Sequence, residues 1–331
     1  MKLFIFLISI LVLSIGVSCQ RNRNSKRKLS AFGGLYPIVF TPMDDGGNIN
    51  MTVIPAYAKY LSKCGVQGAV VADIGGEGPS LSISEKKKLF AAWVISGKPF
   101  GLKIIGVVGG TSGPEVVELA KYAETINIDA LFVLPQPYIE PHTPELITKA
   151  LKELSFHVPS LPLFYNHCPE YTGLDVHAPT LFKIASEKVP QFKGIALEVK
   201  LAVGVIAVNE LRKDQNLFIS NSIAAGGGTL MGFDAFNLIV LNLFPGLIQD
   251  IIKLTSTGDV DRAREEQRKL NTLVATITKQ GDYISAQKAA MEIITGLPMG
   301  KPRSPLRSIS REGRNNIKDI LKDCGIDIAK K

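Results

Sequence analysis

Short apolar runs alternate with amphipathic segments along most of the chain. The apolar runs have the length and composition of buried parallel strands, and the segments between them repeat apolar residues at helical spacing. The predicted strands cover residues 35–41, 69–73, 103–108, 130–134, 162–166, 192–197, 217–220 and 235–241. Eight strand and helix pairs in succession predict an α/β fold, a (β/α)8 TIM barrel.

A doubly wound open sheet is the alternative architecture. It is disfavoured because the first predicted strand is not followed by the G-x-G-x-x-G pattern of such folds. Helical patterns continue beyond the last strand, over residues 260–279, 283–294 and 311–322. We therefore expect the barrel strands and helices over residues 33–244, and the last barrel helix with a C-terminal helical extension over 245–331.

The first thirty-two residues have a different character. Lys2 precedes an unbroken apolar stretch over residues 3–17, and Ser18 ends a small, neutral segment. This pattern predicts a signal peptide over residues 1–18 and a secreted, extracellular protein without membrane contact after cleavage. An uncleaved signal anchor is the alternative. Residues 19–32 are expected to form a basic, disordered linker.

The net charge of +8 does not indicate a nucleic-acid-binding protein. Lys2 and five basic residues of the linker supply six of these charges, which leaves about +2 for the rest of the chain. The four cysteines and four histidines lack metal-ligand spacing, so we expect no metal and no cofactor. Asn50-Met51-Thr52 is the one N-x-S/T sequence and a candidate glycosylation site.

Several motifs resemble those of the N-acetylneuraminate lyase and dihydrodipicolinate synthase family, in particular its animal N-acetylneuraminate lyases. They are Phe40-Thr-Pro-Met43, Gly76-Glu-Gly78, Leu81-Ser-Ile-Ser-Glu85, Pro169-Glu-Tyr-Thr-Gly173, Gln287-Lys-Ala289, and Gly296-Leu-Pro-Met-Gly-Lys-Pro-Arg303 with Pro305-Leu306. The resemblance extends over residues 34–326. It implies a (β/α)8 barrel, Schiff-base chemistry on pyruvate, and a homotetramer.

The position of the family's covalent lysine, on the sixth strand, is occupied by Ala196. A methyl group forms no imine, so the lysine's role as nucleophile and electron sink is lost. Lys200 is a candidate substitute, although it lies four positions beyond residue 196, a distance of roughly 13 Å along a strand. Lys193 points to the opposite face of the strand. The family's proton-relaying tyrosine corresponds to Asn166, and Tyr165, one residue away, is expected to face the surrounding helices.

The resemblance also assigns substrate-binding positions to the loops after the strands. Two adjacent hydroxyl residues that hold the pyruvate carboxylate correspond to Ile74 and Gly75. The loop after the seventh strand, where sialate lyases carry an acidic pair, has Ser220, Ser222 and Ile223, and the serine of the eighth-strand loop corresponds to Ile239.

Together with the predicted signal peptide, these replacements predict a secreted, non-catalytic member of the lyase family that binds a small ligand or a protein partner. The first alternative is an active Schiff-base aldolase or lyase, which converts N-acetylneuraminate to N-acetylmannosamine and pyruvate with a displaced lysine. The second is a hydrolase at the barrel mouth that uses His167 or Glu77. His167 and Cys168 also suggest a nucleophile pair, although adjacent residues rarely face each other.

Overall fold

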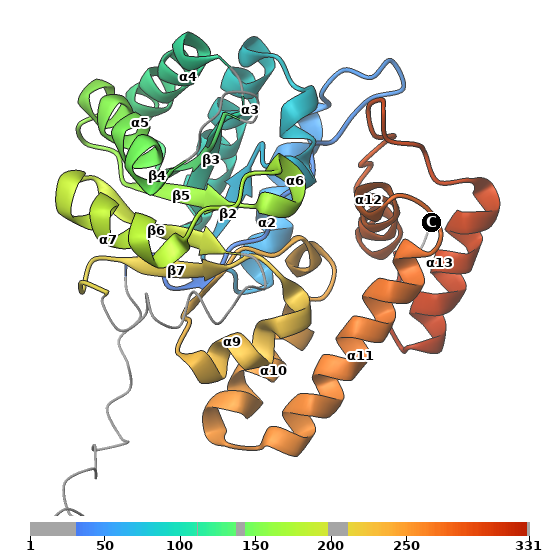
Figure 1. The fold of residues 1–331 in the computed structure, drawn as a ribbon. Coiled ribbons are helices and arrows are strands. Elements are labelled where there is room, and N and C mark those ends of the chain that lie inside the picture. Colours follow the sequence, from blue (N-terminus) through green and yellow to red (C-terminus); the bar gives the residue numbers. More distant parts are fainter. Residues whose placement is uncertain (1–30, 111, 137–142, 198–210, 330–331) are drawn as a thin grey trace, which may run out of the picture.

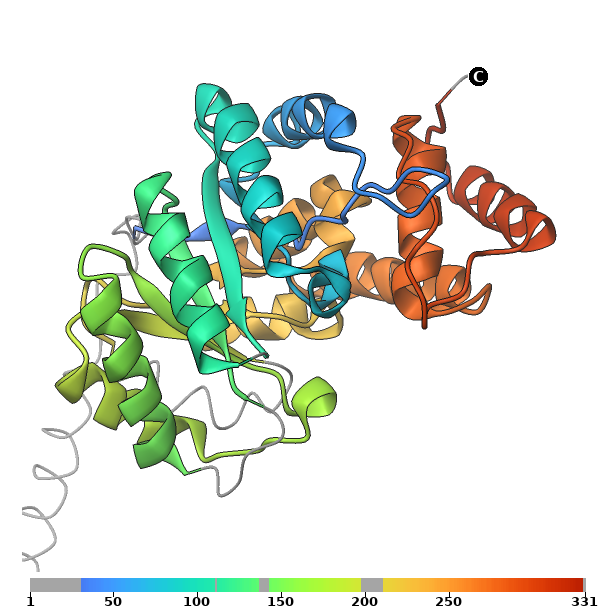
Figure 2. The same cartoon turned by 90° about the horizontal axis from the view of Figure 1, so that it is seen from above.

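The computed structural model describes residues 31–110, 112–136, 143–197 and 211–329. Eight parallel strands form one sheet, surrounded by helices, with further helices of the C-terminal region on one side (Figures 1 and 2). The strands are β1 (Gly34–Leu35), β2 (Gly68–Val71), β3 (Lys103–Gly109), β4 (Ala130–Leu134), β5 (Leu163–His167), β6 (Phe192–Leu197), β7 (Asn216–Ile219) and β8 (Ala235–Phe236).

The sheet closes into a barrel. Strands β2 to β8 pair in sequence order, and β8 pairs with β1. The chain after β1 then meets β2, because Ile38 and Val70 form a parallel bridge and the Val39 N–H donates to the Val70 carbonyl at 3.0 Å. Closure satisfies the backbone groups that an open sheet would leave at its edges. The architecture is the (β/α)8 TIM barrel that the alternation of apolar runs predicts.

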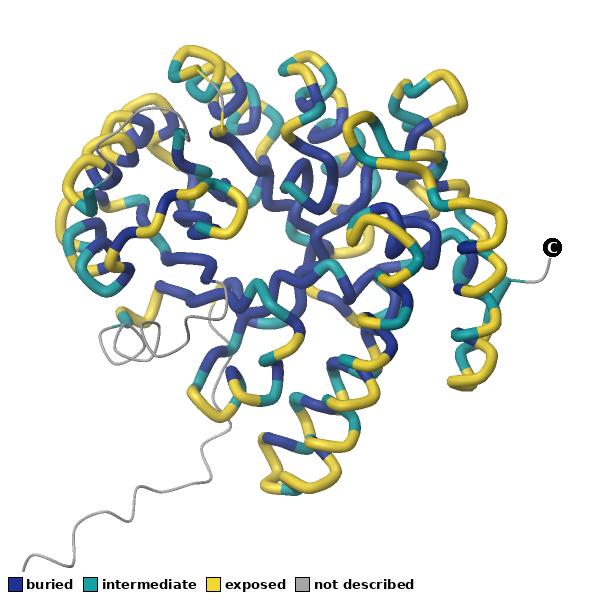
Figure 3. The backbone as a smooth tube through the Cα atoms, turned by 45° about the vertical axis from the view of Figure 1, so that its right-hand side comes forward, coloured by how far each residue is buried: buried dark blue, intermediate teal, exposed yellow. Residues whose placement is uncertain are grey.

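The helices that surround the barrel follow the strands in order. They are α2 (Ile54–Lys63), α3 (Ile83–Gly97), α4 (Gly113–Thr125), α5 (Pro144–His157), α6 (Pro169–Thr172), α7 (Ala178–Lys188), α9 (Ala225–Met231) and α10 (Pro245–Thr257). Short 3-10 turns are η1 (Met51–Val53), η2 (Ile74–Gly76), η3 (Gly78–Ser80), η4 (Lys98–Phe100), η5 (Ser222–Ala224) and η6 (Ile239–Asn242). The strands are buried and the outer helix faces are exposed (Figure 3).

Aromatic rings fill the inside of the barrel. Phe132, Phe164 and Phe218 come from β4, β5 and β7, and each pair of these rings meets edge to face with centroids 5.1–5.7 Å apart. Tyr36 joins them at 5.5 Å from Phe218. Edge-to-face contacts are a favourable geometry for aromatic pairs. The barrel therefore has a packed interior beneath its mouth.

A glycine in β6 is required by the neighbouring strand. The backbone of Gly194 has φ +147°, and a Cβ atom placed there would lie 1.8 Å from the carbonyl oxygen of Asn216 in β7. Any larger residue would push the two strands apart. Gly194 thus fixes the close approach of β6 and β7, two residues before Ala196.

The C-terminal helices are α11 (Val260–Thr278), α12 (Tyr283–Thr295) and α13 (Arg311–Asp323). They are joined to the barrel by a buried ion pair, in which Lys288 Nζ of α12 lies 2.7 Å from Glu77 Oε1 and both side chains are 1% exposed. The Arg303 guanidinium also pairs with Glu85, which forms a capping box with Ser82 at the start of α3. The extension is therefore fixed to the loops that follow β2.

Two strand predictions are too long. Of residues 35–41 only Leu35 lies in regular strand, within β1 (Gly34–Leu35), because Pro37 and Pro42 have no N–H for a ladder. The predicted strand 235–241 ends at Phe236, and Ile239–Asn242 form a 3-10 turn. The apolar pattern of 235–241 reflects burial in the barrel mouth, which periodicity does not separate from a strand. Residues 192–197 and 130–134 form β6 and β4 as predicted.

Candidate functional site at the barrel mouth

A cavity of ≈ 290 Å³ lies where the carboxyl ends of the strands meet. This is the end at which TIM barrels place their functional groups. Its described lining residues are Ile38, Asp73, Ile74, Gly75, Asn166, Cys168, Glu170, Tyr171, Ser220, Asn221, Ser222, Ile223, Asn237, Leu238, Ile239, Val274 and Tyr283. The barrel loops, α11 and α12 all contribute to the wall.

Asp73 is a buried carboxyl group at the base of the η2 turn, and it is 3% exposed. Its Oδ1 accepts a hydrogen bond from the Ile74 N–H at 2.7 Å and from Asn166 Nδ2 at 3.3 Å. Burial raises the pKa of the Asp73 carboxyl to about 6, although these two hydrogen bonds act in the opposite direction. At pH 7 Asp73 is therefore mainly a carboxylate, held in a desolvated place.

Ser220 and Asn237 form a second polar group, at the ends of β7 and β8. Ser220 Oγ donates to Asn237 Oδ1 at 2.9 Å. Asn237 is 0% exposed, and its Nδ2 has no hydrogen-bond partner within the described part of the chain. A buried amide donor without a partner is costly, so a ligand that accepts a hydrogen bond there would be stabilised.

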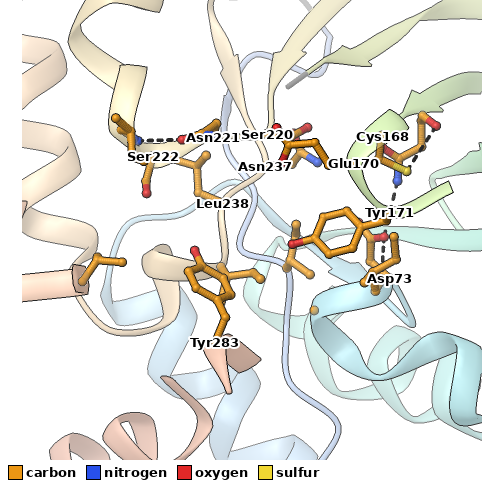
Figure 4. Close-up of a pocket in the computed structure, with 17 residues that line it drawn as sticks. Asp73, Cys168, Glu170, Tyr171, Ser220, Asn221, Ser222, Asn237, Leu238 and Tyr283 are labelled. Atoms are coloured by element: carbon orange, nitrogen blue, oxygen red, sulfur yellow. Dashed lines mark hydrogen bonds between the residues drawn. The ribbon is translucent and has the colours of Figure 1, made fainter. Parts of the chain in front are cut away.

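Two tyrosines extend into the cavity from different sides (Figure 4). Tyr171 belongs to α6, and Tyr283 is the first residue of α12. Both residues are exposed, at 55% and 40%. The cavity thus joins a desolvated carboxylate, an amide and two aromatic rings.

Ala196 lies beneath this cavity and does not line it. Its side chain is 0% exposed and belongs to the apolar cluster inside the barrel. Its strand neighbours in register are Asn166 of β5, which does line the cavity, and Phe218 of β7. The position that the resemblance assigns to a covalent lysine is a packed methyl group.

Two described lysines near β6 and β2, Lys193 and Lys288, pair with carboxylates and do not line the cavity. Lys193 Nζ lies 2.6 Å from Asp214 Oδ2 and donates to the Pro190 carbonyl, at the amino end of β6. Lys288 is paired with Glu77. Lys200, the candidate substitute, lies outside the described residues.

The six positions assigned to substrate binding come together around the cavity. Ile74, Gly75, Ser220, Ser222, Ile223 and Ile239 all line it. Two of them are packed against each other, because a Cβ atom at Gly75 would lie 2.6 Å from Ile239 Cδ1 and 2.9 Å from Ile38 Cγ2. A hydroxyl side chain at position 75 therefore has no room while Ile239 keeps this conformation.

Three other candidates do not face the cavity. Tyr165 is 1% exposed and lies with α4 and α5 residues outside the sheet. His167 packs beside Tyr165, with ring centroids 5.9 Å apart, and its Nε2 lies 3.4 Å from Asp175. Cys168 lines the cavity but His167 does not, so the chain does not bring them together as a nucleophile pair. Glu77 is in the buried ion pair with Lys288.

Three cavity residues do not stand out in the sequence as binding groups. Asp73 ends a predicted strand, Asn237 lies within an apolar run, and Tyr283 begins a helix far along the chain. The signal for Asp73 is its position directly before Ile74 and Gly75. Within the described ranges, no group of three or more His, Cys, Asp and Glu side chains is arranged to hold a metal ion. No described helix is long and apolar enough to cross a membrane.

The fold and the position of the cavity define a (β/α)8-barrel protein whose functional site lies at the carboxyl ends of its strands. The chain belongs to the dihydrodipicolinate synthetase family, whose sequence profile matches residues 31–324. It is 31% identical to human N-acetylneuraminate lyase over 300 residues, which cover 90% of this chain and 93% of that protein. Zebrafish (Danio rerio) N-acetylneuraminate lyase is 28% identical over 283 residues, 85% of this chain and 92% of that protein.

Solved structures support the same fold. Proteus mirabilis N-acetylneuraminate lyase superimposes with a TM-score of 0.84 at 23% identity, over 89% of this chain and 99% of that one. A catalytic lysine mutant of Ruminococcus gnavus sialic acid aldolase superimposes with a TM-score of 0.83 at 21% identity, over 89% and 96% of the two chains. At these identities the superpositions establish the barrel and its helical C-terminus.

Proposed function

We propose that this chain is a non-catalytic member of the family, which binds a small ligand in the barrel-mouth cavity. The observation that carries the proposal is the packed methyl group of Ala196 where the resemblance implies a Schiff-base lysine. An iminium electron sink requires an amine, and no described lysine lines the cavity.

The neighbouring positions support the same proposal. Asn166 occupies the place of the proton-relaying tyrosine, and its amide donates to Asp73 at 3.3 Å. An amide does not exchange a proton as a phenol does. Ile74 and Gly75 supply no hydroxyl group for a carboxylate, and Ile239 fills the space beside Gly75. These substitutions fit one another as packing, which is expected of a pocket retained for binding.

An active aldolase or lyase is the alternative. It is favoured by the 31% identity to human N-acetylneuraminate lyase. Such an enzyme would cleave N-acetylneuraminate to N-acetylmannosamine and pyruvate through a displaced lysine. Lys200 is the candidate for that amine.

Incubation of the purified chain with pyruvate and borohydride should leave its intact mass unchanged. Borohydride reduces an imine to a stable amine, so a Schiff base would be recorded as a covalent pyruvyl adduct. A pyruvyl adduct on the folded protein would contradict the proposal that this chain is non-catalytic. If one forms, its loss in Lys200→Met and its retention in Lys193→Met would identify Lys200 as the displaced nucleophile.

We further propose that the protein is exported, glycosylated at Asn50 and assembled as a homotetramer. The apolar stretch of residues 3–17 supports export. Asn50 is half-buried and caps η1, with Oδ1 accepting from Thr52 Oγ1 at 2.6 Å.

Three measurements test these expectations. The exported protein should start near Cys19, and it should lose mass on glycosidase treatment. Its light scattering should give the mass of a tetramer. An intact N-terminus on a membrane-bound product, or a strict monomer, would contradict these expectations.

A further inference from the structure

The charged side chains that line the cavity are acidic. Among the described lining residues these are Asp73 and Glu170, and none is Lys or Arg. Asp73 Oδ1 receives both hydrogen bonds of its carboxyl group, from Ile74 and Asn166, and Oδ2 has no partner among the described residues. Because Asp73 is desolvated, its charge acts more strongly on a ligand than a surface charge would.

The acidic lining favours a positively charged ligand, and so do the aromatic rings of the wall. Tyr171 and Tyr283 extend into the cavity from different sides (Figure 4). The face of a tyrosine ring carries partial negative charge and attracts ammonium groups. The apolar side chains of Ile38, Ile74 and Ile239 supply surface against which methyl or methylene groups can pack.

The amide of Asn237 indicates a second feature of the ligand. The side chain is completely buried and lines the cavity, and its Nδ2 has no partner within the described part of the chain. Its Oδ1 is already occupied by Ser220 at 2.9 Å. The remaining group, Nδ2, is a donor, so a ligand atom that binds it must be a hydrogen-bond acceptor, such as a hydroxyl oxygen.

We propose that the cavity binds a small organic cation that also carries a hydroxyl group, an amino alcohol. The proposal rests on the proposed binding function and adds the class of ligand. The ammonium group lies against the carboxylate of Asp73 and the tyrosine rings, and the hydroxyl oxygen accepts from Asn237. A keto acid is disfavoured, since its carboxylate would meet Asp73 and Glu170 without a described cation to pair with. The volume of ≈ 290 Å³ suits a ligand of this size.

Calorimetric titration with choline tests the ligand class. Its matched control is 3,3-dimethyl-1-butanol, which has the same shape and hydroxyl group but a carbon in place of the charged nitrogen. Choline should bind with an affinity at least about tenfold higher than this alcohol. Pyruvate should show no binding. Equal affinity for choline and the alcohol, or no binding of choline, would overturn the proposal.

The Asp73→Asn variant locates the cation. It keeps the size and hydrogen-bonding oxygen of the side chain and removes the charge, so it should lower choline affinity by about tenfold and leave affinity for the alcohol unchanged. Asp45→Asn, at an exposed loop position, is the matched control and should bind choline as the native chain does. Undiminished choline binding by a folded Asp73→Asn variant would show that the cation binds elsewhere.

The outcomes separate this inference from the proposed function. A pyruvyl adduct after borohydride treatment would remove the non-catalytic proposal, whatever the choline titration gives. Preferential binding of the neutral alcohol without any adduct would leave a non-catalytic binding protein and remove the amino alcohol as its ligand class.

Discussion

Replacing Lys288 with methionine should lower the free energy of unfolding by about 3–5 kcal/mol at neutral pH. Lys288 and Glu77 are each 1% exposed, and their charged atoms lie 2.7 Å apart. Methionine is similar in length and fills the same space. The expected loss therefore comes from the carboxylate of Glu77, which keeps the Arg303 backbone N–H at 2.7 Å but loses its ionic partner.

A second substitution distinguishes a lost charge from lost packing. Adding Glu77→Gln to Lys288→Met removes the unpaired charge, so the double variant should regain most of the lost stability. Lys279→Met, at the exposed residue that follows α11, should remain within about 0.5 kcal/mol of the native chain. Urea unfolding measures all three. A double variant as unstable as Lys288→Met would assign the effect to packing, and a fully stable single variant would contradict the expectation.

Asp73→Asn should act in the opposite direction and stabilise the protein above pH 6 by about 3 kcal/mol. Asp73 is 3% exposed and its carboxylate has no ionic partner among the described residues. Burial raises its pKa from the ordinary 3.8 to about 6, which means that the folded state holds the proton more tightly than the unfolded state. Asparagine reproduces the neutral form and still accepts from the Ile74 N–H.

The sign of the pH dependence follows from these two pKa values. Below pH 3.8 the carboxyl group is protonated in both states, so the native protein and the Asp73→Asn variant should differ little in stability. Between 3.8 and about 6 the folded chain binds more protons, so the native protein loses stability relative to the variant as pH rises. Above about 6 the difference should stay constant.

Urea unfolding of both proteins from pH 3.5 to pH 8 measures this difference. The exposed carboxylate variant Asp45→Asn should show no such pH-dependent gain. A constant difference across the whole range would show that the charge of Asp73 is not its cause. A destabilised Asp73→Asn protein at pH 8 would mean that the carboxylate is more strongly stabilised than the structure indicates.

The barrel was predictable because its strands are buried on both faces. Residues 130–134 are a continuous apolar run and residues 192–197 are apolar apart from Lys193, and they form β4 and β6 at the predicted limits. The first and last strands were predicted too long. Near β1 the prolines interrupt the hydrogen-bond ladder, and beyond β8 the apolar residues are buried in a turn at the barrel mouth.

The cavity was predictable only in part. The family resemblance supplied Ile74, Ser222 and Ile239 as neighbours, and all three line the cavity in the structure. It did not supply Asp73, because its importance comes from burial, which a sequence does not display. Tyr283 reaches the mouth because α12 is fixed by the pair of Lys288 and Glu77, 211 residues apart in sequence. Such long-range contacts have no local pattern.

The contact between position 75 and Ile239 couples these two positions in any change of the pocket. A side chain cannot be added at Gly75 while the Cδ1 atom of Ile239 lies 2.6 Å from where its Cβ would be. That atom is the end of a flexible side chain, so Ile239 must turn to another rotamer or be replaced by a smaller residue. The two positions are therefore expected to be epistatic, because the effect of a hydroxyl residue at position 75 depends on how Ile239 yields.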